Sequence, residues 1–182
     1  DKTFILQEPR EGTGHAVYSV MNMVNNDKKV VVVLYADQPL VSKYTINKII
    51  STHLEKKPIV TLATIILPDF KDWRSGMNHF GRIIRGENGS INKIVEFKDA
   101  TEDEKLIKEI NPSFYAFDAK WLRENINKLK NENSQNEYYL TDLIKIAFMQ
   151  NAKIETVLID NHIEGLQPNS KEELELLENF AV

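Results

Sequence analysis

Two polar residues follow predicted strands, at positions where they can hold a metal ion. Asp37 comes directly after the hydrophobic run at residues 30–35, and Asn169 lies between the last predicted strand and the last predicted helix. Ligands of open α/β sheets bind at the carboxyl ends of strands, and carboxylate and amide oxygens suit Mg²⁺. Both residue types also begin helices. For Asp37 the two interpretations stay open, whereas the local sequence around Asn169 favours a cap formed by Asn169 or Ser170.

A glycine-containing turn, Gly12-Thr13-Gly14, precedes a helix predicted at residues 14–25. Glycine lets a ligand approach the backbone closely, and the free N–H groups of a helix N-terminus favour anions. A flexible turn followed by a helix cap explains the same residues. The turn on its own favours this simpler role.

The histidines and the segment around Trp73 are weaker candidates. The sequence shows neither metal-ligand spacing nor a serine-nucleophile elbow, so surface or packing roles are favoured for His15, His53, His79 and His162. Residues 69–78, which include Trp73, are polar. The sequence leaves open whether they form a lid or an ordinary loop.

Strands and helices in alternation are needed to position these residues. Hydrophobic runs predict strands at residues 3–6, 30–35, 59–67, 114–117 and 154–159, and amphipathic periodicity predicts helices at 14–25, 41–53, 119–130, 139–149 and 171–181. Such alternation is typical of an α/β fold with a mostly parallel sheet. A β-hairpin predicted at 82–97 and a charged helix at 99–109 suggest a small lobe around residues 80–140 within a single domain spanning 1–182.

Composition excludes several classes of protein. The chain has 23 basic and 27 acidic residues, a net charge of −4, without the basic surface of a nucleic-acid-binding protein. Cysteine is absent, which excludes disulfides, thiolate zinc sites and a cysteine nucleophile. No apolar run approaches the length of a membrane span, and no signal peptide is visible, so we expect a cytoplasmic protein. Because the chain starts at Asp1, just before a predicted strand, we expect its start to lie inside a domain.

A series of motifs then runs in order along essentially the whole chain. These motifs are GTGHA at 12–16, YADQPL at 35–40, FGRI at 80–83, IVEFKDAT at 94–101, EIN at 109–111, NEYYLTD at 136–142 and Asn169 ahead of EEL at 172–174. The first two are shared by several nucleotidyltransferases, and the later blocks are more specific. Together they resemble the uridylyltransferase domain of bacterial GlmU-type enzymes, which make UDP-N-acetylglucosamine. The resemblance implies a Rossmann-like nucleotidyltransferase fold.

The resemblance also implies roles for individual residues. Nucleotide binding falls to Gln7, Gly12, Thr13, Tyr35, Ala36 and Asp37, with the first three on the uracil ring. Sugar binding falls to Gly81, Glu96, Asn111, Glu137, Tyr139 and Thr141. Asp37 and Asn169 would together hold Mg²⁺, the implied cofactor. The implied substrates are UTP and N-acetylglucosamine 1-phosphate. No residue is expected to act as a general base, because a phosphate oxygen is already an anionic nucleophile.

Three departures from the family pattern qualify this expectation. Ala36 stands where the family has Gly, and Pro112-Ser113 stands where it commonly has Thr-Gly. The family begins with a strand and a glycine-rich loop that grips the triphosphate, and it also has an acetyltransferase domain. None of these has a match here, so we expect an N-terminally truncated domain. Three hypotheses therefore stay open: a uridylyltransferase completed by an N-terminal chain or a homo-oligomer, an inactive remnant or nucleotide-sugar binding module, and a nucleotidyltransferase for another sugar phosphate.

Overall fold

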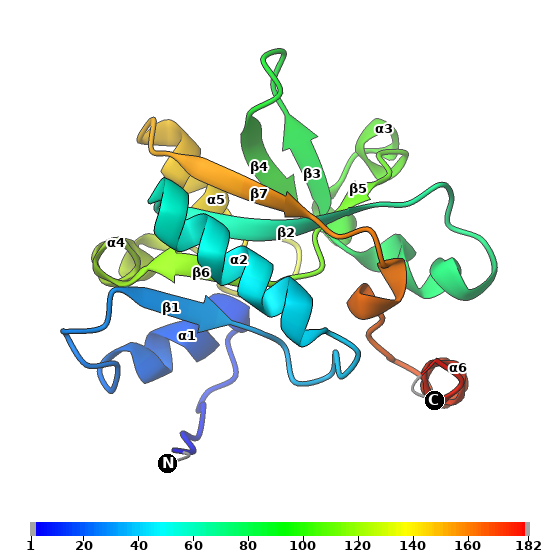
Figure 1. Cartoon of the computed structure of the whole chain (residues 1–182), viewed down its shortest axis with the longest axis horizontal. Coiled ribbons are helices and arrows are strands. Elements are labelled where there is room, and N and C mark those ends of the chain that lie inside the picture. Colours follow the sequence, from blue (N-terminus) through cyan, green and yellow to red (C-terminus); the bar gives the residue numbers. More distant parts are fainter. Residues whose placement is uncertain (1–2, 181–182) are drawn as a thin grey trace.

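The computed structural model describes residues 3–180 and places a twisted sheet at the centre of the molecule (Figure 1). The strands within these residues are β1 (Val30–Val33), β2 (Val60–Ile66), β3 (Arg82–Arg85), β4 (Ile91–Val95), β5 (Glu109–Ile110), β6 (Tyr115–Asp118) and β7 (Ile154–Leu158). Their order across the sheet is β1-β6-β2-β5-β3-β4, and β7 pairs with β2. The predicted hairpin is confirmed, because β3 and β4 pair antiparallel.

The expectation of a mostly parallel sheet needs correction. β1, β2 and β7 run in one direction, but β6 lies between β1 and β2 and runs antiparallel to both. The reason is the lobe: the chain returns from it at the carboxyl end of β2, where Ile110 of β5 pairs with Ile65. A strand that starts from that end must run back along β2. The main sheet is therefore mixed.

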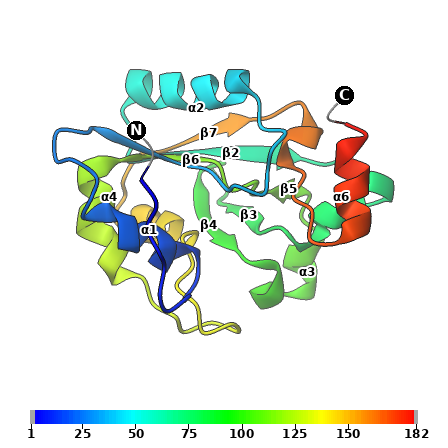
Figure 2. The ribbon, with the colours of Figure 1, turned by 90° about the horizontal axis from the view of Figure 1, so that it is seen from below.

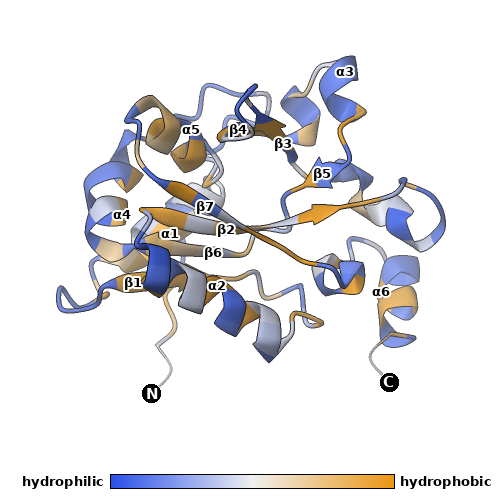
Figure 3. Cartoon of the chain, turned by 45° about the horizontal axis from the view of Figure 1, so that its top comes forward, coloured by the Kyte–Doolittle hydropathy of each residue, from blue (hydrophilic) through white to orange (hydrophobic). Residues whose placement is uncertain are grey.

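Helices cover both faces of this sheet (Figure 2). The α-helices are α1 (Thr13–Met21), α2 (Lys43–Lys56), α3 (Glu102–Lys105), α4 (Ala119–Asn125), α5 (Asp142–Met149) and α6 (Lys171–Glu178). Side chains of α1, α4 and α5 pack on one face against Leu62 and Phe117, and α2 packs on the other against Ala63. β2 is buried over residues 60–65 because it is covered on both faces. Figure 3 shows the hydrophobic residues concentrated in these central strands.

Two segments differ from the sequence-based expectation. Residues 3–6 do not form a strand, and Phe4 is 91% exposed, because no strand of the described chain lies alongside them. Asp1 lies outside the described residues. Residues around Trp73 form a 3₁₀ helix, Asp72–His79, and the Trp73 ring packs 5.5 Å from the Phe180 ring. This packing favours a fixed connection over a lid.

β1 is an edge strand within residues 3–180, and it exposes unpaired backbone N–H and C=O groups. Beside it lies an open apolar groove of about 590 Å³, lined by Val31–Leu34 of the strand region and by Val17 and Val20 of α1. Within the described part of the chain, no helix is long and apolar enough to cross a membrane.

Candidate functional site

Asp37 and Asn169 both contact Gln167. The Asp37 carboxylate Oδ2 accepts a hydrogen bond from Gln167 Nε2 at 2.5 Å, and Asn169 Nδ2 donates to the Gln167 carbonyl at 3.1 Å. These two residues are 132 positions apart in sequence, yet both contact Gln167. That they share one metal ion stays a prediction.

Neither residue is used as a helix cap. Ser42 caps α2 by accepting from the backbone N–H of Thr45 at 3.1 Å, and Ser170 caps α6 by accepting from Glu173 N–H at 3.2 Å. The cap interpretation is therefore wrong for Asp37, whereas the cap favoured at Asn169 or Ser170 is confirmed at Ser170. Both side chains are exposed and offer oxygen donors of the kind that Mg²⁺ prefers. Within residues 3–180 no group of three or more His, Cys, Asp or Glu residues could hold a metal ion.

A second group gathers where the lobe meets the main sheet. Glu96 follows β4, and its Oε1 accepts a hydrogen bond from the Thr141 hydroxyl at 2.7 Å. Gly81 lies beside it: a methyl group on Gly81 would lie 3.5 Å from Glu96 Oε2. The Asn111 backbone N–H donates to the Gly81 carbonyl at 2.9 Å, and its side-chain amide donates to the Tyr115 hydroxyl at 2.6 Å.

Burial sets the electrostatics of this group. Burial raises the pKa of the Glu96 carboxyl, the hydrogen bond from Thr141 opposes the shift, and the charges of Asp142 and Asp99 add to it. Burial also raises the pKa of Tyr35, partly offset by the hydroxyls of Thr13 and Ser113. Tyr35 is thus close to the glycine turn on one side and to the Asn111 turn on the other.

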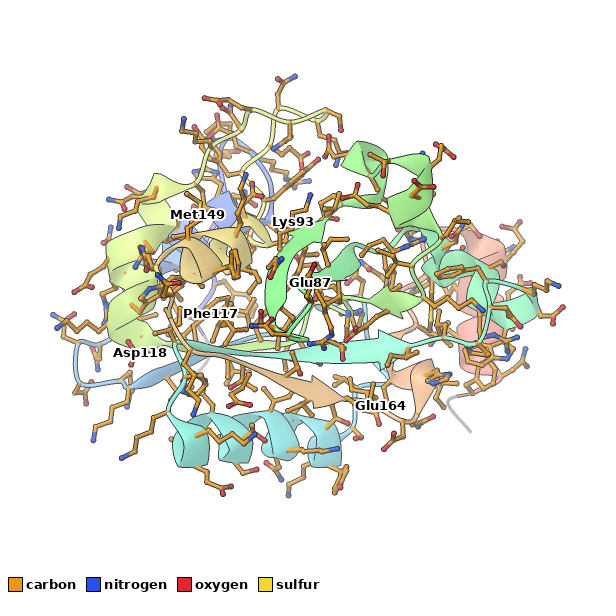
Figure 4. The ribbon with its side chains drawn as sticks, turned by 90° about the horizontal axis from the view of Figure 1, so that it is seen from above. Glu87, Lys93, Phe117, Asp118, Met149 and Glu164 are labelled. Carbon is orange, nitrogen blue, oxygen red and sulfur yellow. The ribbon has the colours of Figure 1, made fainter. Side chains whose placement is uncertain are left out.

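Glu96, Tyr139 and Thr141 also line a cleft of about 640 Å³ between β4, α5 and residues 128–133. Figure 4 labels Lys93 on β4 and Met149 on α5, which belong to its walls. The Tyr139 hydroxyl accepts a hydrogen bond from Gln135 at 2.8 Å. Gly81 and Asn111 are not among the residues that line this cleft.

The glycine turn is docked on the NEYYLTD segment. Gly14 N–H donates to the Tyr138 carbonyl at 2.7 Å, and Thr13 Oγ1 accepts from Leu140 N–H at 3.1 Å. Gln7 donates to the Gly12 carbonyl at 3.0 Å, so its amide already has a partner within the turn. The Cβ of Glu137 faces Gly12, which places Glu137 on the nucleotide side rather than beside Glu96.

Gly12 cannot be replaced without cost. Its φ is 101°, a conformation that favours glycine, and a Cβ there would lie 2.8 Å from the Tyr138 carbonyl oxygen. We expect Gly12→Ala to lower the free energy of unfolding by about 1–3 kcal/mol through backbone strain and by a further amount of about 1–3 kcal/mol through overpacking. The control is Gly89→Ala, because Gly89 has a φ of 77° and open space around it. Equal losses in urea unfolding would contradict the packing argument.

The departures from the family pattern are accommodated. Ala36 is not among the residues with positive φ, so its methyl group meets no backbone strain. Ser113 has a φ of 65°, where glycine is favoured, and its N–H donates to Asn111 Oδ1 at 3.1 Å. That hydrogen bond holds the turn in the shape that a glycine would adopt.

The sequence analysis does not predict two contacts at the site. His79 Nε2 lies 3.0 Å from Asn169 Nδ2, although a surface or packing role was favoured for it. Gln167 contacts Asp37 but belongs to no motif. Both contacts join residues far apart in sequence, and a single sequence carries no sign of such pairs.

The sheet with helices on both faces is a fold of the α/β class. Residues 1–162 match the model of the family described as nucleotidyl transferase, and this chain belongs to that family. The chain is 44% identical over 180 residues to the bifunctional protein GlmU of Fervidobacterium nodosum, and 39% identical over 171 residues to that of Caldicellulosiruptor saccharolyticus. These matches cover 99% and 94% of this chain but 36% and 35% of those proteins. The chain thus spans about a third of the length of these curated relatives.

Solved structures support the fold. A UDP-glucose pyrophosphorylase complexed with UDP-glucose matches with a TM-score of 0.72 and 16% identity, covering 98% of this chain and 65% of that one. A putative glucose-1-phosphate thymidylyltransferase from Bacillus anthracis matches with a TM-score of 0.71 and 16% identity, covering 98% and 64%. The predicted nucleotidyltransferase fold and the resemblance stated from the motifs are confirmed.

Proposed function

We propose that this chain carries the sugar-binding side and the metal ligands of an enzyme that transfers uridylyl from UTP to N-acetylglucosamine 1-phosphate. The products are UDP-N-acetylglucosamine and pyrophosphate, which places the activity in cytoplasmic synthesis of cell-envelope precursors. The observation that carries the proposal is the contact group of Gly81, Glu96, Asn111 and Thr141, which come from four separate motif blocks. The 44% identity to a GlmU protein supports the choice of substrates.

The sugar would bind by hydrogen bonds at this group. Glu96 is a half-buried acceptor already oriented by Thr141, and its Oε2 lies on the side of Gly81. A sugar hydroxyl or amide that donates to Glu96 replaces a bond to water by one in a buried setting, which gives specificity for the sugar. Asn111 and Tyr139 would complete the sugar pocket, whereas Glu137 lies beside Gly12 of the glycine turn.

The transfer requires little covalent chemistry from the residues of this chain. An oxygen of the sugar phosphate attacks the α-phosphorus of UTP, and the bond to pyrophosphate breaks. Because that oxygen is anionic, no proton needs to be removed. The chain contributes orientation, with Gln7, Gly12 and Thr13 on the uracil side and Tyr35 and Ala36 along the nucleotide.

Asp37 and Asn169 are the residues that would hold Mg²⁺. When bound, the ion supplies positive charge that stabilises the negative charge developing on the phosphates. The hydrogen bonds that both residues form with Gln167 support their assignment to one site.

We also propose that the open edge of β1 accepts a further strand in the active form, from an N-terminal segment or chain or from a second copy. The apolar groove of Val31–Leu34 and α1 supports this, because the outer edge of an edge strand flanked by hydrophobic side chains is a ready template for pairing. The same partner would supply the triphosphate contacts that the 182 residues do not match.

Replacing Glu96 tests the sugar site. We expect Glu96→Ala to weaken binding of N-acetylglucosamine 1-phosphate by about 1–3 kcal/mol, because a buried donor of the ligand loses its acceptor. Calorimetry with the 182-residue chain measures the change. Glu109→Ala is the control, because Glu109 pairs with Arg85 outside the group. Equal affinity of Glu96→Ala and the unchanged chain would remove Glu96 from the site.

A further inference from the structure

Gln38 is a buried amide placed between three segments of the site. Its side chain is 2% exposed. Its Nε2 donates to the Pro112 carbonyl at 2.9 Å and to the Gly165 carbonyl at 3.4 Å, residues that are 74 and 127 positions away. Pro112 directly follows Asn111 of the sugar group, and Gly165 begins the segment that leads to Asn169. Gln38 itself follows Asp37.

The turn that carries Asp37 is held to residues 164–167 at two further points. Ser42 N–H donates to the buried Glu164 carboxylate at 2.9 Å, and Asp37 accepts from Gln167. Figure 4 shows Glu164 near the carboxyl ends of β2 and β7. Among the side-chain hydrogen bonds of residues 3–180, those of Gln38 alone join this turn to both the Asn111 turn and the Gly165 segment.

The chemistry of the amide suits this place. The Pro112 and Gly165 carbonyls each accept a hydrogen bond here. A glutamine NH₂ group provides both donors without the cost of burying a charge. The Gln38 Oε1 has no donor among the described residues, and Pro112 has no N–H to offer. An unsatisfied buried acceptor costs stability, so the residue is poorly explained as a stabilising contact.

We propose that Gln38 is a positioning residue that fixes the Asp37 turn against the Asn111 turn and the Gly165–Asn169 segment, and thereby couples the metal side of the site to the sugar side. The coupling rests on the proposed function, whereas the fixing of the three segments does not. Couplings between sites in one protein typically change affinity by about 5–150-fold. N-acetylglucosamine 1-phosphate therefore tightens Mg²⁺ binding by a factor in that range.

The first test needs no ligand. Gln38→Met keeps the length of the side chain and removes both donors. The matched control is Gln150→Met, because Gln150 accepts from Trp121 Nε1 and donates to Asn125, both at 2.8 Å, away from the site. Amide hydrogen exchange is expected to accelerate at least about tenfold at Asn111 and Ser113 and at residues 164–167 and 169 in Gln38→Met, with β2 no faster than in the control. Unchanged exchange at either segment, or equal acceleration everywhere, would overturn the proposal.

The second test measures coupling. Mg²⁺ is titrated with and without N-acetylglucosamine 1-phosphate, and the ratio of the two affinities is expected to fall toward one in Gln38→Met but to stay at the wild-type value in Gln150→Met. A ratio that survives in Gln38→Met would contradict the coupling. If the wild-type chain binds neither ligand, the proposed function fails and the exchange result alone decides on Gln38. Should Gln38→Met not fold, Gln38→Asn keeps the donors but is too short to reach both carbonyls, and the same outcomes apply.

Discussion

The 182-residue chain alone is expected to release pyrophosphate from UTP and N-acetylglucosamine 1-phosphate at least about 10³-fold more slowly than the chain supplemented with an N-terminal segment. That segment carries a glycine-rich loop with an arginine and a lysine. Removing one preorganised donor from a developing oxyanion costs about 10²–10³ in rate. Such a loop provides several donors together, and none of the chain's 182 residues matches it.

A coupled pyrophosphate assay with Mg²⁺ measures this difference. The control is the same segment with its arginine and lysine replaced by alanine. It is expected to pair with the edge of β1 but not to restore the rate. Turnover near a typical enzyme's value of about 10 s⁻¹ by the chain alone would show that the described site is sufficient and that the β1 edge needs no partner.

Removal of the Asp37 carboxylate is expected to have the second largest effect. In the supplemented chain, Asp37→Ala should lower Mg²⁺-dependent transfer by about 10²–10³-fold, because it removes the charged ligand of an ion that stabilises the phosphates. Mg²⁺ titration of the variant should show a matching loss of affinity. Asp27→Ala is the control, since Asp27 is exposed in the connection before β1. If Asp37→Ala binds Mg²⁺ as tightly as the control, the metal site lies elsewhere.

The local sequence pattern predicts two kinds of element well: a strand with a continuous hydrophobic run, and a hairpin with a clear turn sequence between its strands. Residues 60–65 are buried throughout, and their uninterrupted hydrophobic and threonine run predicts such a strand. The hairpin of β3 and β4 follows from a turn at residues 86–89 between two apolar runs. Residues 3–6 have the same local character but form no strand, because a strand needs a neighbour that this part of the chain does not provide.

The direction of β6 and the contacts of the site depend on the whole chain. β6 runs antiparallel to β2 because the chain leaves the lobe at the carboxyl end of β2. No local sequence pattern indicates this direction. Gln38, His79 and Gln167 contact residues 74 to 130 positions away. The sites at Asp37 and Asn169 were identified from strand-end positions and from resemblance. The residues that hold them in place were visible only in the fold.

Mapping the sugar phosphate onto the chain tests the central claim most directly. Amide NMR spectra of the isotopically labelled 182-residue chain are recorded while N-acetylglucosamine 1-phosphate and Mg²⁺ are added. We predict the largest shifts at Gly81, Glu96, Asn111 and Thr141, with Mg²⁺-dependent shifts at Asp37 and Asn169. Shifts confined to other surfaces, such as the hollow lined by His15, Tyr18 and Tyr138, or no shifts at all, would contradict the assignment of this site to the sugar phosphate.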